Sequence, residues 1–79
     1  MRLLFFTAPW CAACHAIESQ VPRDVVRVDC DLDQERAARH NVAGLPLFVA
    51  VDDKDREVAR IQSSNVPMVN KWYEEVCRG

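Results

Sequence analysis

The amino-acid sequence predicts an α/β domain with the element order βαβαββα, built on a four-stranded mixed sheet with helices on both faces. Three observations lead to this fold class. Short apolar runs at 3–6 and 47–51 have the length and composition of buried strands. Segments with helical character separate the strands of the first half. In the second half a tight acidic turn, 52–55, joins two strands as a hairpin that a last helix follows.

Turn and cap residues set the expected limits of each element. The run Thr7-Ala8-Pro9 ends the first strand, Pro22 ends the first helix, and Asp33 can cap a polar, strongly helix-forming segment. The third strand is apolar throughout, which favours a central position. The last helix carries an apolar stripe at helical spacing. The expected elements are strand 2–6, helix 11–20, strand 25–28 or 29, helix 33–40, strand 47–51, strand 57–61 and a helix from 64 or 65 to 77.

Length and charge exclude several classes of function. The 79 residues suffice for one domain, 1–79, with a small core. The net charge of −2 disfavours nucleic-acid binding, which calls for a basic face. No apolar run is long enough for a membrane span, and no signal-peptide pattern precedes the first strand. We therefore expect a monomer in the cytoplasm, where paired cysteines are usually catalytic or metal-binding.

The segment from Trp10 to Cys14 carries the clearest chemical signal. Its C-x-x-C motif lies between a predicted strand and a predicted helix, a setting typical of redox-active cysteine pairs. A helix N-terminus favours a thiolate, so Cys11 is expected to have a lowered pKa and to act as the nucleophile. Cys14 lies about one turn further along the same face. It is therefore the expected resolving thiol.

Three features together resemble the thioredoxin superfamily over essentially the whole chain. They are the motif Trp10-Cys11-x-x-Cys14, the sequence Gly44-Leu45-Pro46-Leu47 before the third strand, and the element order. The chain looks like a small, truncated thioredoxin or a thioredoxin-like glutaredoxin. The resemblance implies that the Leu45–Pro46 bond is cis and lies against the active-site disulfide. It also implies that Leu45 offers its backbone to an extended substrate and that Trp10 shapes the docking surface.

The same resemblance exposes departures from the family pattern. The spacer is Ala12-Ala13 where thioredoxins usually carry Gly-Pro, which predicts a somewhat less reducing couple. Phe5 stands where thioredoxins place a buried Asp below the resolving cysteine. Thioredoxins pair that Asp with a Lys on the neighbouring strand, and the matching position here is Asp29. The Asp29 carboxylate is therefore a candidate proton acceptor for Cys14. His15, directly after the motif, is a second candidate.

The resemblance also implies partners. We expect a dithiol electron carrier that needs no cofactor or metal and reduces protein disulfides, with ribonucleotide reductase as a plausible client. Thioredoxin reductase is the expected electron donor, because Trp10 precedes the motif and no clear Thr-Val-Pro loop of a glutathione site is present. Glutathione is the alternative donor.

Other functions remain open for the same cysteines. Cys11 to His15 also spell C-x-x-C-H, the attachment signature of c-type haem. A zinc site would require two further ligands, for which Cys30, Cys77 and the histidines are the candidates. A redox-inactive binding module is disfavoured because both motif cysteines are present. His40 is expected to be a favourable charge at a helix end, and Cys77 is expected to be more exposed than Cys30.

Overall fold

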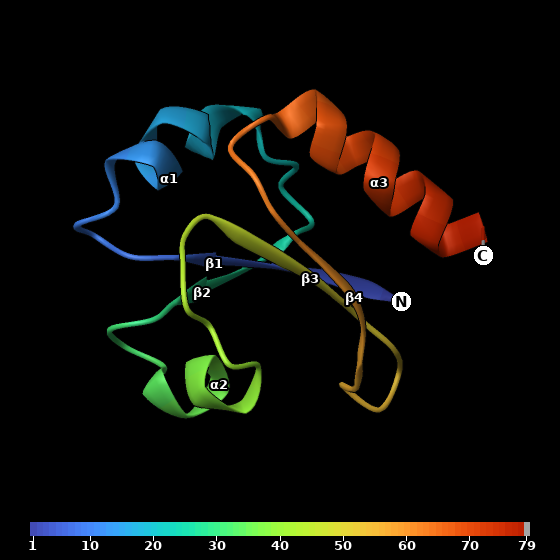
Figure 1. Cartoon of the computed structure of the whole chain (residues 1–79), viewed down its shortest axis with the longest axis horizontal. Coiled ribbons are helices and arrows are strands. Elements are labelled where there is room, and N and C mark those ends of the chain that lie inside the picture. The colour runs from blue at the N-terminus through green and yellow to red at the C-terminus, as the bar shows by residue number, and fades with distance from the viewer. Residues whose placement is uncertain (79) are drawn as a thin grey trace.

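A computed structural model describes residues 1–78 and contains a four-stranded sheet with the strand order β2-β1-β3-β4 (Figure 1). This confirms the predicted α/β fold class. The elements are β1 (Arg2–Thr7), α1 (Ala12–Ile17) with a 3-10 turn η1 (Glu18–Gln20), β2 (Val26–Asp29), α2 (Gln34–Arg39), β3 (Leu47–Val51), β4 (Glu57–Gln62) and α3 (Val66–Arg78).

The two central strands are apolar because both of their faces are covered. β1 pairs in parallel with β2 and antiparallel with β3, and β3 pairs antiparallel with β4. All five residues of β3 are buried, as the unbroken apolar run predicts. The parallel pair places the end of β1, and therefore the loop that follows it, at the same edge of the sheet as the end of β2.

Helices cover the two faces unequally. α1 and α3 lie over one face and α2 over the other (Figure 1). Phe5 and Phe48 belong to the core under α1 and α3, which also contains the buried face of α1 and the first turns of α3. Phe6 and Val49 belong to the core on the α2 side. Alternation along β1 therefore divides its side chains between two separate cores.

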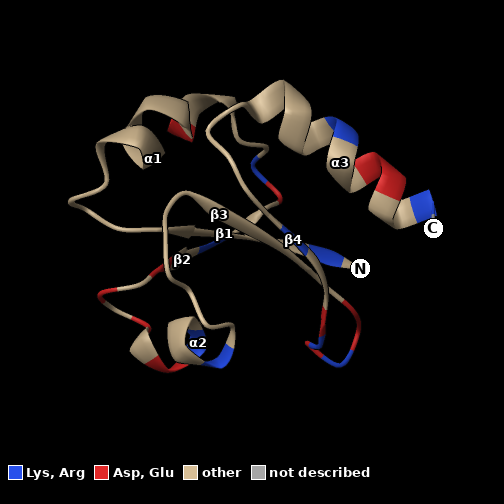
Figure 2. Ribbon diagram, in the orientation of Figure 1, with Lys and Arg blue, Asp and Glu red and all other residues tan. Residues whose placement is uncertain are grey.

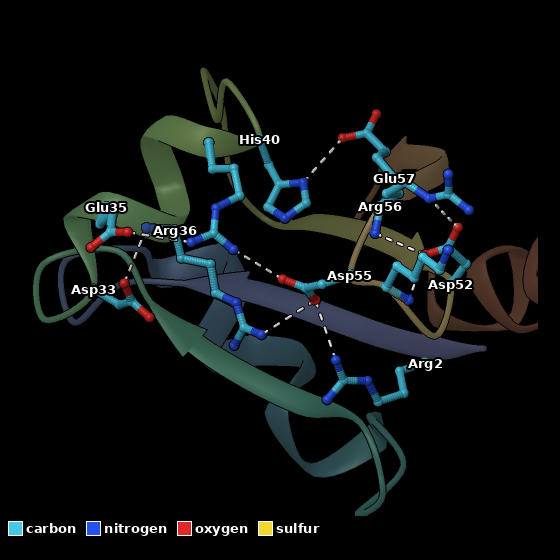
Figure 3. A network of polar contacts seen from close by, with 11 residues as sticks. Arg2, Asp33, Glu35, Arg36, His40, Asp52, Asp55, Arg56 and Glu57 are labelled. Atoms are coloured by element: carbon cyan, nitrogen blue, oxygen red, sulfur yellow. Dashed lines mark hydrogen bonds and ion pairs between the residues drawn. The ribbon is translucent and has the colours of Figure 1, made fainter.

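α2 is held mainly by charges, because none of its residues is buried. Figure 3 shows the polar network that fastens it to the β3–β4 turn. Asp55 is its centre, with Arg39 at 3.0 Å, Arg2 at 3.3 Å and Arg36 at 3.5 Å from its carboxylate oxygens. These arginines come from α2 and β1, so one carboxylate ties three parts of the chain together.

His40 corrects one expectation of the sequence. The sequence predicts a favourable charge at a helix end, whereas only 4% of the residue's surface is exposed. Its ring packs on Phe6 with 5.6 Å between ring centroids, and Nδ1 lies 3.3 Å from Glu57 Oε1. Arg60 donates to the carbonyl oxygen of His40 and to Glu57. The residue is thus a buried link between α2 and β4.

The observed limits of α1 and α3 lie close to those that the sequence predicts. The α-helical part of α1 ends at Ile17 and the chain tightens into η1, so the expected helix to Gln20 is present with a change of type. α3 begins after Asn65, whose Oδ1 accepts a hydrogen bond from the backbone N–H of Met68 at 3.1 Å. Val66 and Val69 of its stripe are buried.

Candidate active site

Cys11 and Cys14 lie at disulfide-bonding distance where β1 gives way to α1. Their Cα atoms are 5.3 Å apart. Cys11 is the N-cap residue of α1 with an extended backbone, and its Sγ accepts a hydrogen bond from the backbone N–H of Cys14 at 3.2 Å. Cys11 is 7% exposed and Cys14 is fully buried. Of the two cysteines only Cys11 therefore keeps any exposed surface, which fits its expected role as nucleophile.

A short turn presents Cys11 at this position. The backbone N–H of Cys11 donates to the carbonyl of Ala8 at 3.1 Å, and the carbonyl of Cys11 accepts from the N–H of His15 at 3.2 Å. The His15 ring adds a third contact, 2.8 Å from Nε2 to the carbonyl oxygen of Pro9. The loop and the start of α1 carry no charged residue (Figure 2).

An aromatic pair forms the floor beneath the cysteines. Phe5 is fully buried and stacks on Phe48, with 4.9 Å between ring centroids and 11° between ring planes. Both rings belong to the core cluster that contains Cys11 and Cys14. An apolar ring thus occupies the position where the family resemblance places a carboxylate.

The sheet register corrects the alignment that made Asp29 the neighbour of this position. Arg27 lies opposite Phe5 across the β1–β2 pair, whereas Asp29 lies opposite Thr7, one step closer to the loop. Asp29 Oδ1 accepts hydrogen bonds from the backbone N–H groups of Asp31 at 2.8 Å and of Leu32 at 3.3 Å. Its carboxylate therefore shapes the β2–α2 loop, and a role in proton transfer stays a prediction.

The loop before β3 approaches the same end of the sheet. The peptide bond between Leu45 and Pro46 is cis. Leu45 lines a shallow, mostly apolar groove of about 110 Å³ together with Trp10 and Cys30; its other lining residues are Ala37, Val42, Ala43 and Gly44. The structure thus brings together the expected docking residues Trp10 and Leu45.

Trp10 is displayed rather than packed into the core. Its side chain is 69% exposed, and its indole N–H donates to Asp31 Oδ1 at 3.3 Å. Leu32 beside this contact is 86% exposed. Sequence reasoning missed Leu32, because an isolated leucine in a polar loop gives no periodic signal. Trp10 thus exposes an apolar ring directly before Cys11 in the chain, and Leu32 exposes an apolar side chain directly after Asp31.

A third cysteine lies at the groove. Cys30 is half-buried and unpaired, and Cys77 is exposed and unpaired, as the sequence indicates. Burial raises the pKa of the Cys30 thiol, and the carboxylates of Asp29, Asp31 and Asp33 raise it further. The protonated thiol is a weak nucleophile, so Cys30 is a poor competitor for Cys11.

Within residues 1–78, no group of three or more His, Cys, Asp or Glu side chains is placed to hold a metal ion. The zinc alternative therefore lacks a ligand set in this part of the chain. No helix among the same residues has both the length and the apolar character needed to cross a membrane.

The geometry agrees with a comparison against known protein families. The family model described as thioredoxin matches residues 1–72. The chain belongs to the thioredoxin family. Membership and the cysteine pair together identify a thiol–disulfide oxidoreductase. Among curated proteins, no sequence matches this thioredoxin-family chain.

Solved thioredoxin structures share the fold. Thioredoxin from Fasciola hepatica is 31% identical, with a TM-score of 0.77 over 98% of this chain and 80% of that one. Thioredoxin from Trypanosoma brucei brucei has a TM-score of 0.84 at 21% identity, over 99% of this chain and 75% of the other. A thioredoxin from Nicotiana alata has a TM-score of 0.82 at 22% identity, over 92% of this chain and 70% of the other.

Proposed function

We propose that the chain is a protein disulfide reductase, a dithiol electron carrier that works through Cys11 and Cys14. The observation that carries the proposal is the difference between the two sulfurs. Cys11 caps a helix, receives a backbone N–H and is 7% exposed, whereas Cys14 is fully buried one turn away. One sulfur is placed to meet a client and the other to complete the exchange.

The reaction proceeds in two exchanges. The Cys11 thiolate attacks one sulfur of a client disulfide, so that the client S–S bond breaks and a mixed disulfide forms. Cys14 then attacks Cys11 Sγ as a thiolate, which closes the Cys11–Cys14 bond and releases the second client thiolate. Two electrons pass to the client, whose sulfurs take up two protons. Asp29 and His15 are the candidates for accepting the proton of Cys14.

Docking of the client is assigned to the uncharged surface around Cys11. Trp10, Leu45 and Pro46 supply apolar contact, and the Leu45 backbone is proposed to pair with an extended client segment. An open, shallow groove of about 110 Å³ suits a polypeptide better than a small molecule, because ligand pockets are typically larger and more enclosed. Ribonucleotide reductase is a candidate client.

The reductase is proposed to act as a single-domain monomer in a reducing compartment, the cytoplasm. The unpaired thiols of Cys30 and Cys77 support this location, since free cysteines persist where disulfides are kept reduced. Thioredoxin reductase is the proposed electron donor. A glutaredoxin-type reaction with glutathione is the alternative.

Insulin reduction tests the activity, and the electron donor is varied in the same assay. With NADPH and thioredoxin reductase, the wild-type chain should reduce insulin catalytically, whereas glutathione with its reductase should support a much slower rate. The reverse order would assign the chain to the glutaredoxins. Failure with both donors, together with failure of the pre-reduced protein to complete one turnover, would reject the reductase function.

The roles of the two cysteines are separable by substitution. Cys11→Ser should abolish insulin reduction, because no accessible thiolate remains. Cys14→Ser should accumulate mixed disulfides with clients, detected as a mass increase that dithiothreitol reverses. Cys77→Ser, which removes an exposed unpaired thiol outside the groove, is the matched control and should retain activity. Full multi-turnover activity of Cys14→Ser would contradict the dithiol mechanism.

A further inference from the structure

The two residues between the cysteines add little rigidity to the start of α1. The spacer residues Ala12 and Ala13 are small and exposed, and neither restricts the backbone as proline does. The α-helical part is only six residues long. Short helices are marginal on their own. The geometry of the redox couple must therefore depend on contacts from outside the helix backbone.

His15 makes such a contact. Its Nε2 lies 2.8 Å from the carbonyl oxygen of Pro9, and a carbonyl can only accept, so Nε2 carries the hydrogen. Pro9 is the second residue of the turn whose ends are joined by the bond from the Cys11 N–H to the Ala8 carbonyl. The ring thus bridges from the residue after Cys14 to the turn before Cys11.

This bridge closes a loop of hydrogen bonds around the couple. The His15 backbone N–H bonds to the Cys11 carbonyl, the Cys14 N–H bonds to Cys11 Sγ, and the His15 ring bonds to Pro9. Without the ring, Pro9 is joined to the start of α1 only by the chain itself and by the bond from the Cys11 N–H to the Ala8 carbonyl. The turn would then move more freely relative to α1.

We propose that His15 is a positioning residue for the Cys11–Cys14 couple, acting through the hydrogen bond from its ring to the Pro9 carbonyl. The inference rests on the proposed redox function and adds the device that holds the two sulfurs in register. Restricting the turn raises the effective concentration of one sulfur at the other, which favours closure of the ring. His15 acts here through the N–H at Nε2, a role separate from proton transfer.

Equilibration with glutathione buffers tests the proposal directly. The wild-type chain, His15→Ala, His15→Gln, His15→Lys and the control Ser19→Ala are equilibrated anaerobically at pH 7, and the disulfide fraction is quantified by alkylation and mass shift. His15→Ala should lower the equilibrium constant for disulfide formation about three- to tenfold, the range expected for one lost hydrogen bond. His15→Gln, which keeps a neutral N–H donor of similar reach, should restore it to within about twofold.

Two outcomes would overturn the proposal. An unchanged equilibrium constant in His15→Ala would show that the ring contributes equally to the oxidised and reduced forms, or to neither. Restoration by His15→Lys but not by His15→Gln would assign the effect to charge. Ser19→Ala, on the exposed turn after α1, should match wild type. The equilibrium needs neither a client nor a reductase, so a failed insulin assay leaves this result independent.

Discussion

The stacked pair of Phe5 and Phe48 offers a quantitative test of how the floor of the active site stabilises the fold. Both side chains are at most 1% exposed and their rings stack at 4.9 Å. Aromatic pairs contribute about 0.5–1.5 kcal/mol beyond the area they bury. In a double-mutant cycle of Phe5→Leu and Phe48→Leu, we expect a coupling free energy in that range. Each single variant should lose about 1–3 kcal/mol of unfolding free energy.

Losses of this size leave each single variant folded. At about 0.05–0.15 kcal/mol per residue, a chain of this length is stable by roughly 4–12 kcal/mol. A loss of 1 kcal/mol should lower the melting temperature by about 4–8 °C. Urea unfolding of the reduced proteins, followed by circular dichroism, gives the four free energies at an unchanged slope.

A matched cycle supplies the control. Phe6 points to the α2-side core, away from Phe48, so Phe6→Leu and Phe48→Leu should add to within about 0.3–0.5 kcal/mol. A coupling of Phe5 with Phe48 no larger than that of the control pair would refute the role assigned to ring stacking. The floor would then act through buried area alone.

Three further predictions concern charges and the redox couple. Asp55→Asn keeps a side chain that tolerates the left-handed backbone at this position but leaves three arginines without their shared carboxylate. This substitution should lower the unfolding free energy by about 1–2 kcal/mol. The control Asp53→Asn, at an almost fully exposed site, should change the unfolding free energy little. Hydrogen bonds from Arg60 and then His40 hold the pKa of Glu57 below its ordinary value of 4.5, so the ionised carboxylate stabilises the fold above that pH. The urea concentration at the unfolding midpoint should therefore fall as the pH drops below about 4.5. The midpoint of Glu57→Gln should fall less over the same pH range. The reduction potential, measured against glutathione buffers, should lie at roughly −200 to −270 mV, and a value near −120 mV would place the protein among the oxidases.

Most of the secondary structure could be predicted because the signals are local. The third strand has the predicted limits, and the limits of the other elements differ from prediction by at most two residues when η1 is counted with α1. Apolar runs, Pro22 and the Asp33 cap each act within a few residues of where they stand. The change from α-helix to a 3-10 turn after Ile17 has no comparable signal, because the three residues of η1 are polar and none of them is buried.

The errors at the site arose where distant segments meet. Alternation along a strand tells which residues share a face but leaves the register between strands open, so Asp29 was placed opposite Phe5 where the sheet places Arg27. Burial of His40 depends on Glu57 and Arg60 from another strand. The cysteine pair Cys11 and Cys14 could be predicted from the sequence, because its chemistry depends only on a spacing of three residues and on the start of one helix.

The composition of the two outer strands bears on how the protein behaves at high concentration. Unpaired strand edges invite pairing between molecules. β2 is only four residues long, and its Arg27 pairs with Glu18 and reaches the carbonyls of Val21 and Val25 at 3.4 Å. β4 carries charged residues and meets β3 with an irregular register at Ala50/Val51. Short, charged and irregular edges of this kind discourage edge-to-edge pairing and fibril growth.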